Sequence, residues 1–127
     1  MILIIGGKAQ GKRDYLLSLG YSDLQIADGE HCPIDVCPDE ETLDKLHLVV
    51  RRLLEAGKDP VRWVEQYCME HPHWIITADE VGAGIVPMDP AEREWREQCG
   101  RICCRLAAQA DRVVRLYAGI PTLIKGK

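Results

Sequence analysis

A glycine-rich stretch near the start of the chain has the residue types that bind phosphate groups. Residues 6–12, Gly-Gly-Lys-Ala-Gln-Gly-Lys, fit the phosphate-loop pattern G-x-x-x-x-G-K. Glycines let several backbone N–H groups turn toward one anion, and the final lysine reaches the terminal phosphates. We therefore expect a nucleotide to bind at Gly6, Gly7, Lys8, Ala9, Gln10, Gly11, Lys12 and Arg13.

The residue after this lysine departs from the pattern. A serine or threonine usually follows, and its hydroxyl holds magnesium, whereas this chain has Arg13. A guanidinium group cannot coordinate a cation, although it can hydrogen-bond a phosphate. Two interpretations stay open. Either Arg13 adapts the loop to a nucleotide or another anion bound without metal, or its side chain points to solvent and the function has been lost. We therefore assign no residue as a metal ligand.

Two acidic residues follow a second apolar stretch. Residues 74–78, Trp-Ile-Ile-Thr-Ala, read as a buried strand, and Asp79 and Glu80 come directly after it. Carboxylates at such a strand end, opposite a phosphate loop, can hold a magnesium-bound water or act as a general base. The alternative is an ordinary solvated loop or a helix cap. We predict catalytic roles for both residues, together with Lys12.

Four further residues are weaker candidates. Asp28 and Glu30 end another apolar stretch and could take the same acidic role. His31 lies in an irregular segment near the expected ligand. His47 lies beside the apolar stripe of a predicted helix, so a partly buried structural role explains it better than catalysis.

Six cysteines give little sign of a metal site. The chain has no C-x-x-C pair, and in a cytosolic protein such thiols are usually reduced and packed as small apolar side chains. His71 and His73 lie near Cys68 in the sequence. We interpret them as two exposed histidines at a helix end rather than as metal ligands.

The composition is that of an ordinary single domain. The chain has 127 residues, of which 46% are hydrophobic and 28% are charged. A net charge of −4 argues against a nucleic-acid partner, which usually requires a basic surface. No apolar run reaches the length of a membrane span, and a cytoplasmic location is expected.

Strands and helices should alternate along the chain. Strands are predicted at residues 1–5, 23–27, 74–78, 112–118 and 122–124. Helices are predicted at residues 12–19, from Asp39 to Gly57, from Pro60 after the cap Asp59, and from Pro90 after the cap Asp89.

This alternation predicts an α/β fold for residues 1–127, a small three-layer domain of the phosphate-loop NTPase type with a mainly parallel sheet. Ligands in such sheets bind beyond the carboxyl ends of the strands. The glycine-rich loops at 6–11 and 82–84 both leave strands at that end. We therefore expect these two loops to face each other across one site.

Several segments resemble one enzyme family. Residues 80–87, Glu-Val-Gly-Ala-Gly-Ile-Val-Pro, resemble a distinctive segment of the bifunctional adenosylcobinamide kinase / adenosylcobinamide-phosphate guanylyltransferase family. Residues 100–111 resemble its G-R…R-L-A-A-x-A-D helix, and residues 118–125 resemble its C-terminal end. The opening residues 4–12 are similar to its first strand and phosphate loop. The resemblance is thus placed at both ends of the chain, and the middle is left unmatched.

The resemblance implies both a fold and an activity. The fold would be related to recombinase-type NTPases, and the assembly would be a homotrimer. The activity would use GTP or ATP to phosphorylate a corrinoid side chain, and would then transfer GMP through a guanylylated histidine during assembly of the cobalamin nucleotide loop. A nucleotide and a corrinoid of the cobinamide type are the ligands that follow from this resemblance.

The chain departs from the family's pattern in three places. Arg13 replaces the serine of the loop, Asp79 replaces an asparagine, and the arginine-rich stretch that carries the nucleophilic histidine has no counterpart. That role is therefore not transferred to His31 or His47. We expect a nucleotide-binding protein of cobalamin biosynthesis, active as a phosphotransferase or nucleotidyltransferase, with guanylyl transfer left unassigned. The alternative is a catalytically silent nucleotide- or corrinoid-binding protein with a regulatory or scaffolding role.

Overall fold

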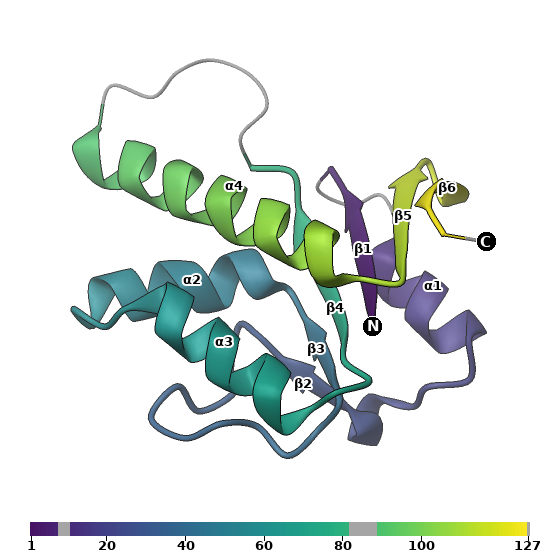
Figure 1. Ribbon diagram of the computed structural model, residues 1–127, viewed down its shortest axis with the longest axis horizontal. Helices are drawn as coiled ribbons and strands as arrows, with labels where there is room; N and C mark the ends of the chain where they lie inside the picture. The colour runs from purple at the N-terminus through teal and green to yellow at the C-terminus, as the bar shows by residue number, and fades with distance from the viewer. Residues whose placement is uncertain (8–10, 82–88, 127) are drawn as a thin grey trace.

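The computed structural model describes residues 1–7, 11–81 and 89–126, which are built around one sheet (Figure 1). Within these residues the sheet has six strands in the order β2-β3-β4-β1-β5-β6. All pairs are parallel except β5 with β6, so the predicted α/β fold with a mainly parallel sheet is confirmed. In chain order the elements are β1 (Ile2–Gly6), α1 (Lys12–Ser18), a 3-10 turn η1 (Asp23–Gln25), β2 (Ile26–Asp28), β3 (Thr42–Asp44), α2 (Leu46–Glu55), α3 (Pro60–Glu70), β4 (Ile75–Asp79), α4 (Pro90–Gln109), β5 (Arg112–Tyr117) and β6 (Ile120–Lys125).

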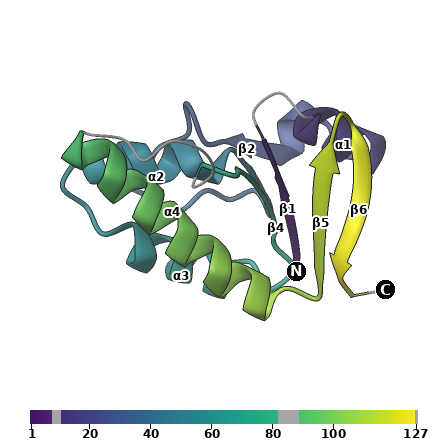
Figure 2. The same ribbon diagram turned by 90° about the horizontal axis from the view of Figure 1, so that it is seen from above.

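The helices cover the two faces of the sheet unequally. Helices α2, α3 and α4 lie on one face, and α1 lies on the other (Figures 1 and 2). The larger core is on the three-helix side and includes the fully buried Leu53, Trp74 and Ile76. A smaller core around Ile4 and Leu16 lies under α1. Because neighbouring strand residues point to opposite faces, the central strands need apolar residues at nearly every position.

The carboxyl ends of β1 and β4 lie side by side. Their parallel register pairs Gly6 with Asp79, and the backbone N–H of Glu80 donates to the Gly6 carbonyl at 2.9 Å. The first residues after each strand are therefore neighbours, as expected for a shared site. Residues 82–84, the second glycine-rich loop, lie outside the described residues.

The segment before α2 differs from the prediction. A single helix was expected from Asp39, but β3 forms first and α2 begins at Leu46. Lys45 stands between them with φ of 63°, in the left-handed region. The apolar pattern was misleading because Leu43 of the strand continues the helical spacing of the residues in α2. The correction places Asp44 at the carboxyl end of a strand, on the same edge as the phosphate loop.

The second predicted strand is shorter than expected. Residues 23–25 form the turn η1, and only residues 26–28 pair with β3. The turn is closed by Ser22 and Gln25: the Gln25 N–H donates to the Ser22 carbonyl at 2.9 Å, and the Ser22 N–H donates to Gln25 Oε1 at 2.8 Å.

The predicted starts of the last two helices are confirmed. The Asp59 side chain accepts a hydrogen bond from the Val61 N–H at 3.0 Å, and Asp89 accepts one from the Ala91 N–H at 2.9 Å. Each caps a helix that begins with proline, whose missing N–H costs nothing at that position.

The C-terminal hairpin lies close to Gly11. Its turn is at Ala118 and Gly119, both with positive φ, so β6 begins at Ile120, earlier than predicted. Gly11 has φ of 91°, and a Cβ added there would lie 3.3 Å from the Gly119 Cα. Gly11 is therefore required both for its backbone conformation and for its closeness to the hairpin.

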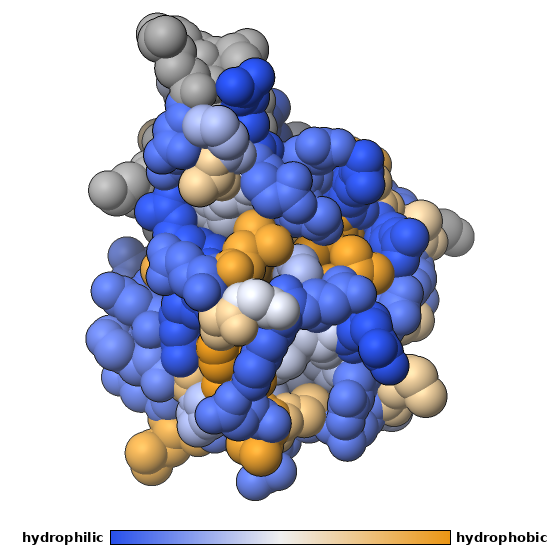
Figure 3. All heavy atoms as spheres, turned by 90° about the vertical axis from the view of Figure 1, so that its left-hand side faces the viewer, coloured by the Kyte–Doolittle hydropathy of each residue, from blue (hydrophilic) through white to orange (hydrophobic). Residues whose placement is uncertain are grey.

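One face of the molecule is mostly polar. Figure 3 shows this face as largely hydrophilic, with patches of apolar side chains near its middle and at its lower edge. Among the described residues, no helix has the length and apolar character needed to span a bilayer.

Candidate functional site

A cleft of about 920 Å³ lies at the carboxyl ends of the central strands. It extends from α1 to the first two turns of α2 and the second turn of α4. The lining residues with chemical potential are Lys12, Arg13, Asp44, His47, Asp79 and Glu80. Parallel sheets bind ligands at this edge, so the described part of the predicted site lies where the fold requires it.

Lys12 is held inside the cleft by a carboxylate and its own loop. Its Nζ lies 2.7 Å from Asp79 Oδ1 and donates to the Gly7 carbonyl at 2.8 Å. The side chain is only 7% exposed. The structure thus brings together two residues predicted for catalysis, Lys12 and Asp79. Lys8, Ala9 and Gln10 of the predicted loop lie outside the described residues.

His47 fixes the position of Asp79. Its Nδ1 accepts the Asp79 backbone N–H at 3.0 Å, and its Nε2 lies 3.3 Å from Asp79 Oδ2. This arrangement requires the proton on Nε2, which then donates to the carboxylate. Burial lowers the pKa of His47, although the nearby Asp79 charge raises it, so the ring is neutral near pH 7. The structural role expected for His47 agrees with this geometry.

Arg13 does not point to solvent. Its guanidinium donates to Asp44 Oδ2 at 3.1 Å and forms a second ion pair with Asp23. Asp44 is buried, with 2% of its side chain exposed, and its Oδ1 accepts the Thr77 hydroxyl at 2.5 Å. Although 37% of the Arg13 side chain is exposed, its guanidinium is directed at two carboxylates, so the expectation that it points to solvent is wrong.

Glu80 belongs to a different set of contacts. Arg115 of β5 donates to both of its carboxylate oxygens, at 2.9 and 3.1 Å. Glu80 follows β4 and lines the cleft, but its carboxylate is bonded to an arginine of β5, the strand on the other side of β1. Asp79 is therefore the acidic residue that contacts Lys12, and the two predicted acids are not equivalent.

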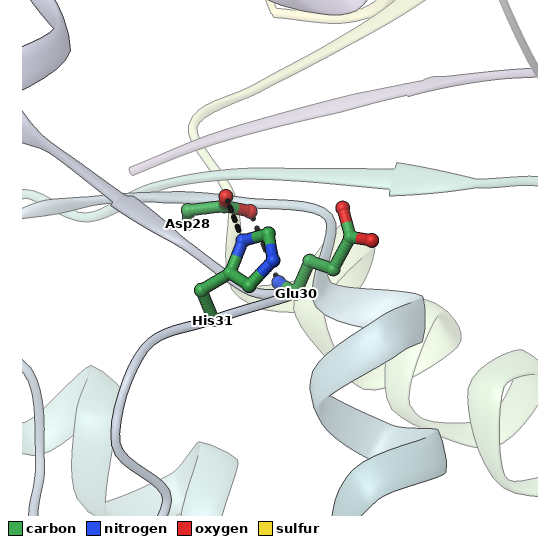
Figure 4. Close-up of side chains that lie close together, drawn as sticks. All are labelled: Asp28, Glu30 and His31. Atoms are coloured by element: carbon green, nitrogen blue, oxygen red, sulfur yellow. Dashed lines mark hydrogen bonds and ion pairs between the residues drawn. The ribbon is translucent and has the colours of Figure 1, made fainter.

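The three weaker candidates at the end of β2 form an exposed cluster. Figure 4 shows the Asp28 carboxylate bonded to the His31 ring, with Glu30 beside this pair, and the Asp28–His31 contact is 2.9 Å. Burial raises the pKa of Asp28, but hydrogen bonds from His31 and the Glu30 amide lower it overall. The Lys45 ammonium lies 3.4 Å from Glu30 and 3.6 Å from Asp28, so a cation already balances these acids.

An arginine and a tryptophan line the far end of the cleft. The Arg51 guanidinium carbon lies 3.8 Å above the Trp95 ring, and Arg51 also pairs with Glu92 at 2.6 Å. The Trp95 Nε1 donates to the His47 carbonyl at 2.7 Å, which ties α4 to the first turn of α2. This end of the cleft therefore presents an aromatic ring stacked with a guanidinium, in the same cavity as Lys12.

The histidines after α3 lie away from the cleft. They precede β4, at the opposite end of the strand from Asp79. His71 was expected to be exposed, but it is buried, and its Nε2 contacts the Pro38 carbonyl at 2.7 Å. His73 is exposed, as expected. The loop before β3 crosses the end of α3, and this long-range contact is what buries His71.

Two residues of the site were missed by the sequence analysis. Asp44 was placed inside a predicted helix, and Thr77 was treated only as part of an apolar strand. Each is almost completely buried, at 2% and 0% exposure. The one usable signal was a polar residue within each of two apolar stretches, which usually requires a hydrogen-bond partner nearby.

Comparison with known proteins agrees with this arrangement. Residues 41–124, about two thirds of the chain, match the family described as cobinamide kinase / cobinamide phosphate guanyltransferase, CobU. The chain belongs to this family. The matched residues include Asp44, His47 and Asp79, but they begin after the phosphate loop. The match contains the resembling segments 80–87 and 100–111 and nearly all of 118–125, extends upstream to residue 41, and does not include residues 4–12.

One similar relative is the bifunctional adenosylcobalamin biosynthesis protein CobU of Salmonella typhimurium. The two sequences are 43% identical over 51 residues, which are 40% of this chain and 28% of the relative. The match thus spans less than a third of the relative's length.

Proposed function

We propose that this chain binds the polyphosphate of GTP or ATP and transfers a phosphoryl group to a cobinamide-type acceptor in cobalamin biosynthesis. The backbone of residues 6–13 and Lys12 would hold the phosphates. Asp79 would accept the proton of the attacking hydroxyl. The observation that supports this proposal best is the convergence of Lys12, Asp79 and His47 in one cleft of a CobU-family chain.

The Lys12–Asp79 pair suits a site that awaits an anion. A buried ammonium needs a negative partner, and Asp79 supplies it at 2.7 Å. An incoming phosphate would offer Lys12 a stronger partner with more negative charge. Asp79 would then be released beside the terminal phosphate, still oriented by His47. Lys12 and Asp79 would thus neutralise each other in the empty site. With nucleotide bound, Lys12 would bind the phosphate and Asp79 would act as the base.

Guanylyl transfer is not part of this proposal. It would require a histidine with an accessible ring nitrogen next to the phosphates. In His47 both ring nitrogens face Asp79. His31 contacts Asp28 through Nδ1 and does not line the cleft. The other two histidines precede β4 at the far end of the strand. None of the four histidines therefore presents an open ring nitrogen to the cleft.

A silent binding protein is the second candidate function. It is favoured by Arg13, which replaces the metal-binding hydroxyl of the phosphate loop and pairs with Asp44. On this alternative the chain would bind a nucleotide or a corrinoid and regulate or scaffold the pathway. The two candidates share the ligand and differ only in turnover.

Calorimetry and a phosphorylation assay test both candidates. We expect GTP or ATP to bind to the wild type and Lys12→Ala to weaken binding at least about tenfold. Lys58→Ala is the matched control, because Lys58 is an exposed lysine paired with Asp35 far from the cleft. Phosphorylation of cobinamide by bound GTP would support the kinase, and binding without turnover would support the silent protein. No binding of either nucleotide would refute the kinase and the nucleotide-binding form of the silent protein, and no binding of cobinamide as well would refute both candidates.

A further inference from the structure

We propose that the guanidinium of Arg13 takes the place of the divalent cation in this phosphate loop, so that the nucleotide binds without metal. The inference rests on the proposed function, because it concerns the nucleotide of that site. The observation that supports it is the ion pair between the Arg13 guanidinium and the buried Asp44 carboxylate, whose nitrogen and oxygen lie 3.1 Å apart.

A magnesium ion in a phosphate-loop site needs two protein ligands from defined positions. One is the hydroxyl after the loop lysine, and the other is a carboxylate at the end of a nearby strand. Arg13 occupies the first position and offers only hydrogen-bond donors, so it cannot ligate a metal. The residues present at this position therefore do not fit magnesium.

Asp44 is the carboxylate at the second position, and both of its oxygens are engaged. It ends β3, which is separated from β1 by β4. Its Oδ2 accepts from Arg13 at 3.1 Å, and its Oδ1 accepts from the Thr77 hydroxyl at 2.5 Å. Thr77 Oγ1 in turn accepts the Lys45 N–H at 2.9 Å, which fixes the direction of the hydroxyl proton.

Burial makes this pair more than a surface contact. Asp44 is 2% exposed, so its charge must be neutralised by a partner within the protein. Arg13 is that partner, and Asp23 holds the guanidinium from the solvent side. A guanidinium is permanently charged and presents several donors in one plane. It can keep Asp44 neutralised while it turns other N–H groups toward a phosphate in the same cleft.

The test is the metal dependence of GTP binding, measured by calorimetry with Mg²⁺ and with EDTA. For the wild type we expect the Kd to change less than about threefold. For Arg13→Ser, which restores the hydroxyl and frees Asp44, we expect removal of Mg²⁺ to weaken binding at least about tenfold. Arg105→Ser is the matched control, because Arg105 pairs with an exposed Glu65 at 3.0 Å on another face.

Two further measurements extend the test: the first needs no Arg13→Ser protein, and the second applies when Arg13→Ser folds. Electron paramagnetic resonance of Mn²⁺ with GTP should show the same spectrum with and without the wild type or Arg13→Lys, with no additional protein-bound ion. The double variant Arg13→Ser with Asp44→Asn should lose the Mg²⁺ dependence that Arg13→Ser gains.

The outcomes separate this inference from the proposed function. Tenfold weaker GTP binding by the wild type in EDTA, or stoichiometric Mn²⁺ in its complex, would overturn the role of Arg13 and leave the nucleotide site standing. A folded Arg13→Ser protein without Mg²⁺ dependence would also overturn it. Absence of GTP and ATP binding under every condition would instead remove the proposed function, and this inference with it.

Discussion

Asp79→Asn is the substitution with the clearest expected consequences, because they have opposite signs. It removes the negative charge next to Lys12 and keeps the shape of the side chain. The asparagine retains the backbone N–H that donates to His47 and an oxygen that can accept from its Nε2. We therefore expect the fold to become less stable and the nucleotide to bind more tightly.

The magnitude follows from the geometry of the pair. Lys12 Nζ and Asp79 Oδ1 are 2.7 Å apart, and the side chains are 7% and 18% exposed. At an effective dielectric constant of about 20 the Coulomb attraction of the two ions is about 6 kcal/mol. Most of this energy is cancelled by the cost of removing both ions from water. Breaking a buried pair costs about 3–5 kcal/mol. Lys12 keeps its bond to Gly7, so we expect a loss near 2 kcal/mol of unfolding free energy.

The same change removes the partner that a phosphate must displace. We expect GTP to bind about threefold to tenfold more tightly, which is about 0.7–1.4 kcal/mol. Urea unfolding measures the stability, and calorimetry measures the affinity. Asp111→Asn is the control, because Asp111 is 75% exposed and pairs with the chain's amino group at 3.0 Å. Unchanged stability together with unchanged affinity for Asp79→Asn would show that Asp79 does not hold Lys12 in solution.

Three other predictions concern pH, the loop glycine and the cysteines. Burial lowers the pKa of His47, so the stability that the neutral ring contributes should be complete above about pH 6.5 and be lost as the pH falls through the folded-state pKa. Urea midpoints should therefore fall between pH 7 and pH 5, and His47→Gln should reduce this dependence of the midpoint on pH. Gly11→Ala should destabilise the protein by about 1–2 kcal/mol, a larger loss of unfolding free energy than Gly20→Ala causes. Both glycines have positive φ, but only at Gly11 would a Cβ lie 3.3 Å from the Gly119 Cα. Equal urea midpoints for the two variants would contradict this contact. A thiol reagent at pH 8 should modify the exposed Cys104 first and Cys99 only on unfolding, because burial raises the pKa of Cys99 to about 12. A fast phase of thiol modification that remains in Cys104→Ser would argue against this order.

The local features of this fold were readable from short stretches of sequence. Strand β1, helix α1, the proline-led helices after Asp59 and Asp89, and the apolar β4 all appear within a residue or two of where they were predicted. Each depends on contacts between residues close in the chain, such as a cap that bonds an N–H two positions later. The position of Asp79 beside the loop lysine also followed from the general geometry of parallel sheets.

The sequence by itself determined that a phosphate-loop lysine and an acidic strand end share one edge of an α/β sheet. Only the tertiary structure decided what Arg13 does, because its partner Asp44 lies 31 positions away on a strand that the apolar spacing had hidden within a helix. Thr77 and His47 acquired their roles in the same way, through strands and helices that meet only after folding. The spacing of apolar residues along the sequence indicates which residues share a face of one helix or strand. The partner of a buried charge, in contrast, comes from whichever element the fold packs against it.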